Sequence, residues 1–174
     1  MTNVVILVGS EGNTTWGFAK DLQNKLHQAG KKVHCAPMND LTKRYPQASV
    51  LFVLTSTYSD GDAPSSASQF MTWLERFQAN DGLEFVVLGF GDQQFPKFCQ
   101  YALDVDAALS SKGLQQMDLV TRIDRGCAMQ FREWGEVFGE HMGISLALTH
   151  NPAPAATAEF EFVERVDYGV AAID

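Results

Sequence analysis

Hydrophobic positions along the chain form two alternating patterns, short continuous runs and longer segments with helical spacing. The continuous runs fall at residues 3–8, 50–54 and 84–91, residues 32–36 alternate weakly, and residues 116–123 are predicted as a fifth strand. Short runs of β-branched and other apolar residues bounded by polar turns are typical of buried strands. Between the runs, apolar residues recur every three or four positions, as at Phe18, Leu22 and Leu26, which predicts amphipathic helices.

The helical segments are expected to end at turn residues. Helices are predicted over about residues 18–30, 65–80, 101–113 and 131–143. Strands that alternate with helices in this way predict an α/β fold with a doubly wound, five-stranded parallel sheet. Because the strands are apolar throughout, helices are needed on both faces of that sheet.

Composition and charge narrow the class of protein. The chain has 174 residues, 45% of them hydrophobic, and a formal net charge of −8. The acidic balance argues against nucleic-acid partners and against anionic membrane surfaces, which attract basic patches. Three cysteines without a CxxC spacing predict neither a disulfide framework nor a zinc site. The sequence shows no apolar run long enough to span a membrane and no signal peptide, so we expect a cytoplasmic protein.

The last part of the chain differs in composition from the rest. Residues 151–158 read NPAPAATA, and residues 159–166 then alternate apolar and polar side chains. A Pro/Ala-rich stretch without periodicity is typical of a connector. We therefore predict a globular domain over residues 1–147 and, over 148–174, a linker leading to a possible further domain. A tail that packs back on the domain is the alternative.

The loop after the first strand is a candidate phosphate site. Residues 10–15 read SEGNTT and precede a predicted helix. Backbone N–H groups at a helix N-terminus, helped by hydroxyl groups, bind phosphate without a cationic side chain. No Lys or Arg lies between Ser10 and Ala19, which excludes a Walker-type P-loop, and no GxGxxG dinucleotide motif is present.

Two further loops follow the third and fourth strands. Residues 54–64 read LTSTYSDGDAP, and residues 89–99 read GFGDQQFPKFC. Ligands of open α/β sheets bind at the carboxyl ends of the strands, where these loops would lie. Tyr58 and Phe95 offer two aromatic faces there, and the glycines of the third loop allow close approach of a ligand.

These motifs resemble the flavodoxin family, most closely the FMN-binding domains of diflavin reductases of the sulfite reductase flavoprotein type. STYSDGDAP is similar to the family's STYGEGE/DPP, and GFGDQQFPKFCQ is similar to its GLGDxxYxxFCQ. The resemblance covers roughly residues 3–143. In the first loop the Gly–Asn pair comes one place earlier than in the family's S/T-x-T-G-N-T pattern.

The resemblance implies the flavodoxin-like strand order 2-1-3-4-5 and an FMN site. It implies phosphate contacts in the first loop, flavin contacts in the second, and contacts with the flavin and ribityl edge in the third. The implied cofactor-binding residues are Ser10, Glu11, Gly12, Asn13, Thr14, Thr15, Ser56, Thr57, Tyr58, Ser59, Asp60, Gly61, Gly91, Asp92, Phe95, Phe98 and Cys99.

Two positions depart from the family pattern. Phe95 stands where the family usually has Tyr, which keeps the ring and removes the hydroxyl. Ser59 stands where the family has Gly, and the resemblance implies that the turn takes up a positive φ at this position when FMN is reduced by one electron. A Cβ at that position is expected to lower the potential of the first one-electron reduction of FMN by roughly 45–90 mV.

The function predicted from these features is FMN-dependent electron transfer. The favoured form is the FMN domain of a diflavin reductase that relays electrons from an FAD/NADPH module to a metalloprotein with haem or an iron–sulfur centre. A stand-alone short flavodoxin is the first alternative, and an FMN-dependent NAD(P)H:quinone reductase is the second. A receiver-like signalling domain would need an acidic pair after the first strand, where Val8–Gly9–Ser10 stands.

Overall fold

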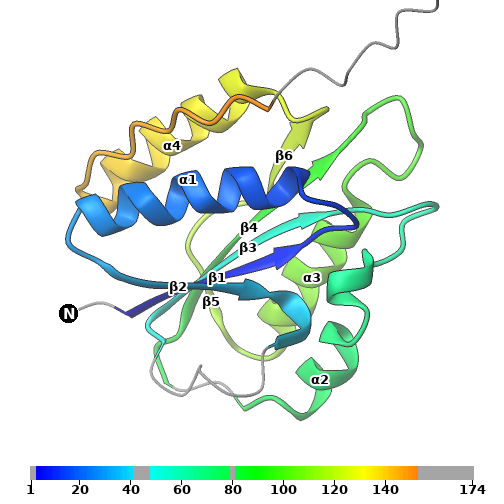
Figure 1. Cartoon of the computed structure of the whole chain (residues 1–174). Coiled ribbons are helices and arrows are strands. Elements are labelled where there is room, and N and C mark those ends of the chain that lie inside the picture. Colours follow the sequence, from blue (N-terminus) through cyan, green and yellow to red (C-terminus); the bar gives the residue numbers. More distant parts are fainter. Residues whose placement is uncertain (1–2, 41–47, 79–80, 153–174) are drawn as a thin grey trace, which may run out of the picture.

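The computed structural model describes residues 3–40, 48–78 and 81–152, and shows a parallel sheet between two layers of helices (Figure 1). The strands are β1 (Asn3–Gly9), β2 (Lys32–Pro37), β3 (Val50–Ser56), β4 (Glu84–Gly91), β5 (Gln115–Gln116) and β6 (Thr121–Asp124). The α-helices are α1 (Thr14–Gln28), α2 (Phe70–Arg76), α3 (Gln100–Ser111) and α4 (Ala128–Met142). Two short 3₁₀ turns, η1 (Met38–Asp40) and η2 (Ser65–Ala67), complete the set.

The strand order is β2-β1-β3-β4-β5, and every strand pair is parallel. This order confirms the predicted doubly wound, flavodoxin-like α/β sheet. The fifth position differs from the prediction in one respect, because a single strand over 116–123 was expected. The structure has two short strands there, β5 and β6, which both pair with β4. Residues 117–120 lie outside the ladder, and Leu119 among them is 77% exposed.

Each face of the sheet carries its own hydrophobic core. On one face, alternate residues of the central strands pack under α1 and α4, with Phe18, Phe131 and Phe138 fully buried. On the other face, the intervening residues pack against α2 and α3. Figure 1 shows these pairs of helices on opposite sides of the strands. Burial on both faces explains why the strand sequences read as continuous apolar runs.

Because the strands are parallel, four of them end at the same edge of the sheet. β1 ends at Gly9, β3 at Ser56, β4 at Gly91 and β6 at Asp124. The register places Gly9 opposite Thr55, Ser56 opposite Phe90, and Gly91 opposite Asp124. The loops that follow these strands therefore meet at the carboxyl edge, which is where ligands bind in open α/β sheets.

The chain continues past α4 as an extended segment that returns along the helices. Gly143 ends α4 in the left-handed conformation (φ 67°), and the segment 144–152 then runs back beside α1 and α4 (Figure 1). Leu146 and Leu148 are 2% and 1% exposed, so this strap is part of the domain core. The predicted boundary at residue 147 stays a prediction, since residues 153–174 lie outside the described residues.

Candidate functional site

The first loop, residues 10–13, is tied to the start of η2. The backbone N–H of Ser10 donates to the Ser66 hydroxyl (2.7 Å), which in turn donates to the Val8 carbonyl (3.2 Å). The Ser65 N–H donates to Glu11 Oε1 (2.5 Å). The carboxylate of Glu11 is thus engaged by a backbone N–H of the neighbouring loop.

The remaining part of this loop is open to solvent. Ser10 and Thr15 are buried, whereas Gly12, Asn13 and Thr14 are exposed where α1 begins. The 15-residue helix α1 presents its first N–H groups at this point. Exposed N–H groups and hydroxyls at a helix N-terminus suit a phosphate group, and no basic side chain is needed for that.

The second loop forms a tight turn with an exposed aromatic ring at its base. Tyr58 and Asp62 exchange two backbone hydrogen bonds of 2.9 and 2.8 Å. The three residues between them include two with positive φ, Ser59 at 46° and Gly61 at 94°. The Ser56 hydroxyl donates to the Gly9 carbonyl (3.3 Å) and so links this loop to the first one.

The third loop, residues 92–99, borders a hollow of about 250 Å³. Its lining comes from two of the predicted loops, namely Thr57, Ser59, Gly91, Asp92, Phe95, Lys97, Phe98 and Cys99. A Cβ at Gly91 would lie 3.1 Å from the Cys99 sulfur and 3.2 Å from the Phe98 ring. Glycine at position 91 therefore lets β4 end close to the start of α3.

Two aromatic side chains of these loops are largely in solvent. Tyr58 is 53% exposed and Phe95 is 65% exposed, which makes them the most exposed aromatic residues of the part of the chain that the structure describes. Exposed aromatic rings at this edge are available to stack on a flat ligand. The structure shows both rings exposed, and their role as the two faces of a binding site stays a prediction.

Cys99 is the innermost of the predicted site residues. It is fully buried, has a positive φ of 55° and immediately precedes α3. Burial raises the pKa of the Cys99 thiol to about 12. A thiol of this kind stays protonated at neutral pH and acts as a small packing residue.

Three residues at this edge were missed in the sequence analysis, Gln93, Lys97 and Asp124. Lys97 Nζ contacts the Asp60 carboxylate at 3.2 Å and the Asp60 carbonyl at 3.1 Å. The Asp124 carboxylate accepts two hydrogen bonds from Gln93. Asp124 directly follows the predicted fifth strand, so the parallel-sheet prediction itself could have placed it at the site.

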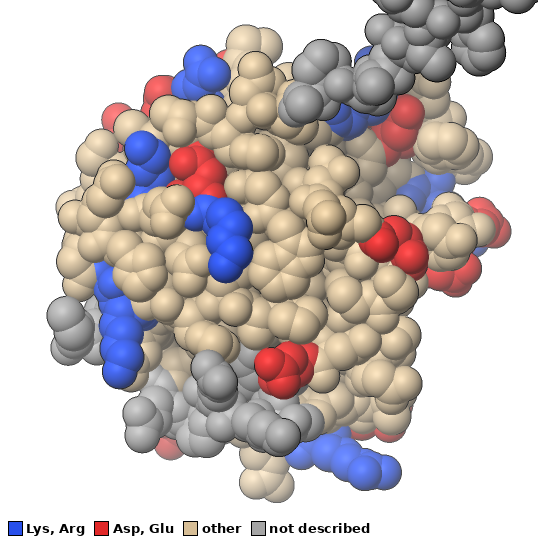
Figure 2. All heavy atoms as spheres, viewed as in Figure 1, with Lys and Arg blue, Asp and Glu red and all other residues tan. Residues whose placement is uncertain are grey.

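Both acidic and basic side chains lie around the site. Figure 2 shows acidic side chains around the loops that project at the right-hand side of this view. The acidic residues of the edge include Asp60, Asp62 and Asp92. Among the basic residues, Arg122 lies over the Phe98 ring, 5.4 Å from its centre.

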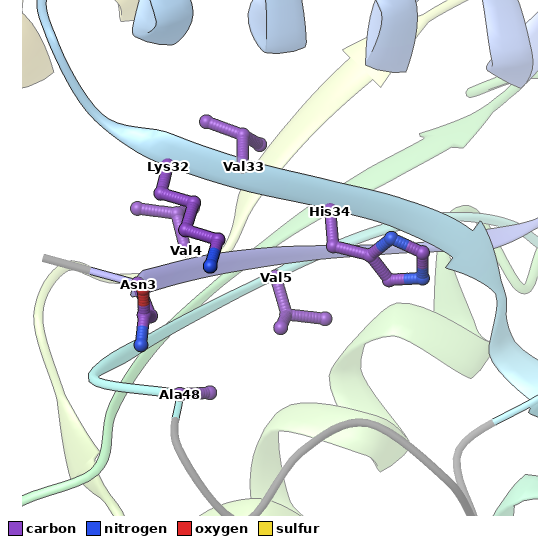
Figure 3. Close-up of a pocket in the computed structure, with 7 residues that line it drawn as sticks. All are labelled: Asn3, Val4, Val5, Lys32, Val33, His34 and Ala48. Atoms are coloured by element: carbon purple, nitrogen blue, oxygen red, sulfur yellow. The ribbon is translucent and has the colours of Figure 1, made fainter.

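A second hollow, of about 320 Å³, lies near the opposite ends of the strands (Figure 3). Its lining comes from the first residues of β1 and β2 and from Ala48: Asn3, Val4, Val5, Lys32, Val33, His34 and Ala48. None of the predicted site residues borders it. The chain just before Ala48 lies outside the described residues, and we assign this hollow no function.

Comparison with known proteins gives the family. A family model described as flavodoxin matches residues 6–134. The chain belongs to the flavodoxin family. FMN is the cofactor of this family and of this chain. The role of the chain is FMN-dependent electron transfer.

Two of the curated relatives of this chain are reductases that are much longer than the chain itself. The chain is 31% identical over 113 residues to the bifunctional cytochrome P450/NADPH–P450 reductase 1 of Bacillus subtilis, a match that covers 63% of this chain and 11% of the relative. It is 28% identical over 175 residues to the sulfite reductase [NADPH] flavoprotein alpha-component of a Shewanella species, covering 95% and 29%. The chain thus spans less than a third of the length of these curated relatives.

Solved structures support the same fold. A flavodoxin of Streptococcus pneumoniae superposes with a TM-score of 0.70 at 25% identity, over 82% of this chain and 98% of that one. Oxidised flavodoxin 2 of Bacillus cereus gives a TM-score of 0.70 at 19% identity, over 80% and 99%. No helix within the described ranges has the length and apolar character needed to cross a bilayer.

The residues at the carboxyl edge fit an FMN molecule. The hollow is bordered by the Phe95 ring and by Thr57 and Ser59, the neighbours of the exposed Tyr58. The exposed N-terminus of α1 suits the single phosphate group of FMN, which needs less positive charge than a triphosphate. The fit therefore rests on the shape and chemistry of three loops from different strands.

Proposed function

We propose that this chain is the FMN domain of a diflavin reductase. In that role it accepts electrons from an FAD/NADPH module and passes them to a metalloprotein that holds haem or an iron–sulfur centre. The observation that carries the proposal is a similarity in sequence. The chain matches segments of much longer proteins that are named as NADPH–P450 reductase and NADPH sulfite reductase flavoprotein. A cytoplasmic location is part of the same proposal.

Each of the three loops would contact a different part of FMN. The N–H groups and hydroxyls of residues 10–15 bind the phosphate, and residues 56–61 run along the flavin with Tyr58 on one face. Phe95 covers the other face, while Gly91 and Asp92 meet the flavin and ribityl edge. Phe98 and Cys99 pack beside that edge.

FMN supplies the electron chemistry, and the protein supplies binding and environment. The residues around the hollow include no strongly activated nucleophile, and Cys99 is held in its thiol form by burial. The chain's own contribution is to orient the ring system, to cover its two faces with Tyr58 and Phe95, and to leave an edge accessible to a partner.

The first experiment measures the cofactor itself. Purified protein should contain one FMN per chain, identified by mass spectrometry of the released flavin. Tyr58→Ala and Phe95→Ala should each weaken FMN binding by roughly tenfold, because an aromatic pair contributes about 0.5–1.5 kcal/mol beyond the area it buries. Met129→Ala is a matched control, since Met129 is a similarly exposed apolar residue on α4 (62%). Recovery of FAD, or of no flavin, would contradict the proposal.

A second experiment distinguishes the FMN domain of a diflavin reductase from a quinone reductase and from a stand-alone flavodoxin. NADPH added to the FMN-loaded chain should leave the flavin absorbance unchanged under anaerobic conditions, and addition of an FAD/NADPH reductase module should bleach it. Direct reduction by NADPH would favour the quinone reductase instead. Rapid reduction by a separate small reductase, but not by a diflavin module, would favour the stand-alone flavodoxin.

Acidic residues of the second loop are proposed to steer a basic partner. Asp60 and Asp62 are both exposed in that loop, and the Asp60 side chain is 82% exposed although it contacts Lys97. Exposed charges act over a Debye length of ~8 Å at physiological salt, so they affect mainly the association rate. Electron transfer to the native acceptor should slow as ionic strength rises. A rate that is indifferent to salt would exclude this steering.

A further inference from the structure

The loop that carries Phe95 has little packing to hold it in place. Residues 93–97 are all exposed, and the first buried residue after them is Cys99. Short local hydrogen bonds shape its first turn, since Asp92 accepts from the N–H of Gln94 (2.9 Å) and from the N–H of Phe95 (3.1 Å). These bonds make residues 92–95 one compact unit, but they do not fix that unit to the rest of the protein.

Asp124 attaches this unit to β6. Its Oδ1 accepts a hydrogen bond from the backbone N–H of Gln93 (3.0 Å), and its Oδ2 accepts one from the Gln93 side-chain amide (2.9 Å). The two bonds grip both the main chain and the side chain of one residue. Gln93 lies two positions before Phe95, so its position determines where the Phe95 ring can reach.

Asp124 is itself held from three directions. It pairs with Gly91 in the β4–β6 ladder, and its backbone N–H donates to Gln130 Oε1 from α4 (2.8 Å). Arg125 Nε lies 3.5 Å from Oδ2, and the Arg125 N–H donates to the Gly91 carbonyl (2.6 Å). The backbone of Asp124 is therefore held by β4 and α4, and its carboxylate is in contact with Arg125.

A second polar contact of the loop with a distant segment, between Lys97 and Asp60, is weaker. Lys97 meets Asp60 on the far side, but these two side chains are 49% and 82% exposed. Exposed ion pairs contribute little to stability because water and salt screen them. The Asp124 side chain is 13% exposed, so its charge-assisted hydrogen bonds are the stronger anchor.

We propose that Asp124 is a positioning residue for the cofactor: through Gln93 it holds residues 92–95 in the conformation that FMN needs, before FMN arrives. The inference rests on the proposed function of Phe95 as a stacking residue. Preorganisation of this kind raises the fraction of apo molecules that are competent to bind. Its loss should therefore lower the association rate of FMN more than it raises the dissociation rate.

The test uses stopped-flow quenching of FMN fluorescence by the apo-protein. Asp124→Ala should weaken FMN binding by about tenfold, mainly in the association rate, because it removes both hydrogen bonds to Gln93. Asp124→Asn keeps an oxygen for the Gln93 N–H but cannot accept from the Gln93 amide, so its effect should be smaller. Glu133→Ala, which removes an exposed carboxylate from α4, should bind FMN as the wild type does.

Gln93→Ala keeps the proposal testable if Asp124→Ala does not fold. Gln93 is exposed and lies outside the core, so its replacement should leave thermal stability unchanged. It should slow FMN association by about threefold, and it should have no further effect when Asp124 is already Ala. Hydrogen exchange in the apo-protein should be faster at the amides of residues 93 and 95 in Asp124→Ala and in Gln93→Ala than in the wild type or in Glu133→Ala.

The outcomes distinguish this proposal from the one on which it rests. If wild-type apo-protein does not quench FMN fluorescence, FMN binding itself fails. If the wild type binds FMN but Gln93→Ala and Asp124→Asn associate at its rate, the positioning role is overturned. A loss confined to the dissociation rate would also overturn it, because that pattern belongs to a direct contact with bound FMN.

Discussion

Asp21, on α1, accepts hydrogen bonds from the backbone N–H groups of Thr149 (2.7 Å) and His150 (2.8 Å), 128 and 129 positions further along the chain. The strap formed by residues 144–152 is thus locked to the first helix. It reaches the carboxyl edge of the sheet at Pro152, next to Gly126 in the turn between β6 and α4. Pro152 therefore lies at the same edge of the sheet as the proposed cofactor site.

Replacing Asp21 should loosen the strap. Asp21→Ala removes the acceptor for two backbone N–H groups and for the Thr149 hydroxyl (3.4 Å). We expect the free energy of unfolding to fall by about 1–2 kcal/mol and the melting temperature by roughly 2–8 °C. Amides of residues 146–150 should exchange faster than those of α1. Glu136→Ala, which removes an exposed carboxylate from α4, is the control and should change neither quantity.

Helical glycines make room for the same strap. A Cβ at Gly17 would collide with the His150 imidazole, which also packs edge-on against Phe18 with ring centres 4.6 Å apart. Helix propensity alone predicts that Gly17→Ala stabilises the protein by about 1 kcal/mol. We expect a destabilisation of about 1–3 kcal/mol instead, because the added methyl group overpacks the contact.

A double-mutant cycle tests that explanation. In a His150→Ala background, Gly17→Ala should become neutral or stabilising, so the two substitutions should show strong coupling in urea unfolding. Additive effects would mean that the glycine is not there to accommodate the strap.

The fold was predictable because its determinants are local and regular. Fully buried parallel strands produce continuous apolar runs, and the predicted bounds of the fourth strand, 84–91, coincide with β4. The edge strand was harder to predict, because only one neighbour constrains it. Residues 117–120 (MDLV) are mostly apolar, apart from Asp118, but the structure assigns them to no strand and exposes Leu119.

The site was predictable only where a loop carries its own chemistry. Tyr58, Phe95 and the glycines could be identified within single loops. The Gln93–Asp124 contact joins residues 31 positions apart, and the strap joins residues more than 120 positions apart. Neither leaves a periodic pattern in the sequence, because each depends on how the finished sheet brings separate loops together.

Stability should fall at alkaline pH through two buried groups. Burial raises the pKa of the Cys99 thiol to about 12, and burial, helped by the charge of Asp104, also raises the pKa of the Tyr101 hydroxyl. A raised pKa in the folded state means that the protonated form is favoured by folding. The stabilisation is therefore complete below about pH 9 and is lost as the pH rises toward 12.

The measurement is urea unfolding as a function of pH. Each of the two groups should contribute a slope of up to about −1.4 kcal/mol per pH unit in this window. Cys99→Ala should flatten the slope, even if it lowers stability at neutral pH by removing a packed side chain. A Cys99 thiol that reacts with a thiol reagent in the native protein at pH 8 would contradict the assigned burial.

Ser59 already has a positive φ, which the glycine of its family counterpart adopts more easily. Its φ is 46° in a turn closed by the Tyr58–Asp62 hydrogen bonds. The cost of placing a Cβ in the left-handed region is about 1–2 kcal/mol, and here it is present before any change in the cofactor. The expectation of a 45–90 mV effect assumed that Ser59 would meet this cost only on reduction of FMN.

Ser59→Gly should therefore act on stability more than on potential. We expect the free energy of unfolding of the apo-protein to rise by about 0.5–1 kcal/mol, since relief of the strain exceeds the added chain entropy of glycine. Ser59→Ala keeps a Cβ and should show no such gain, which makes it the matched control. The potential of the first one-electron reduction of bound FMN should shift by well under the 59 mV that corresponds to a tenfold change in equilibrium. Anaerobic potentiometric titration of the three proteins measures this shift, and a difference of 59 mV or more between glycine and serine would show that residue 59 changes conformation when FMN is reduced.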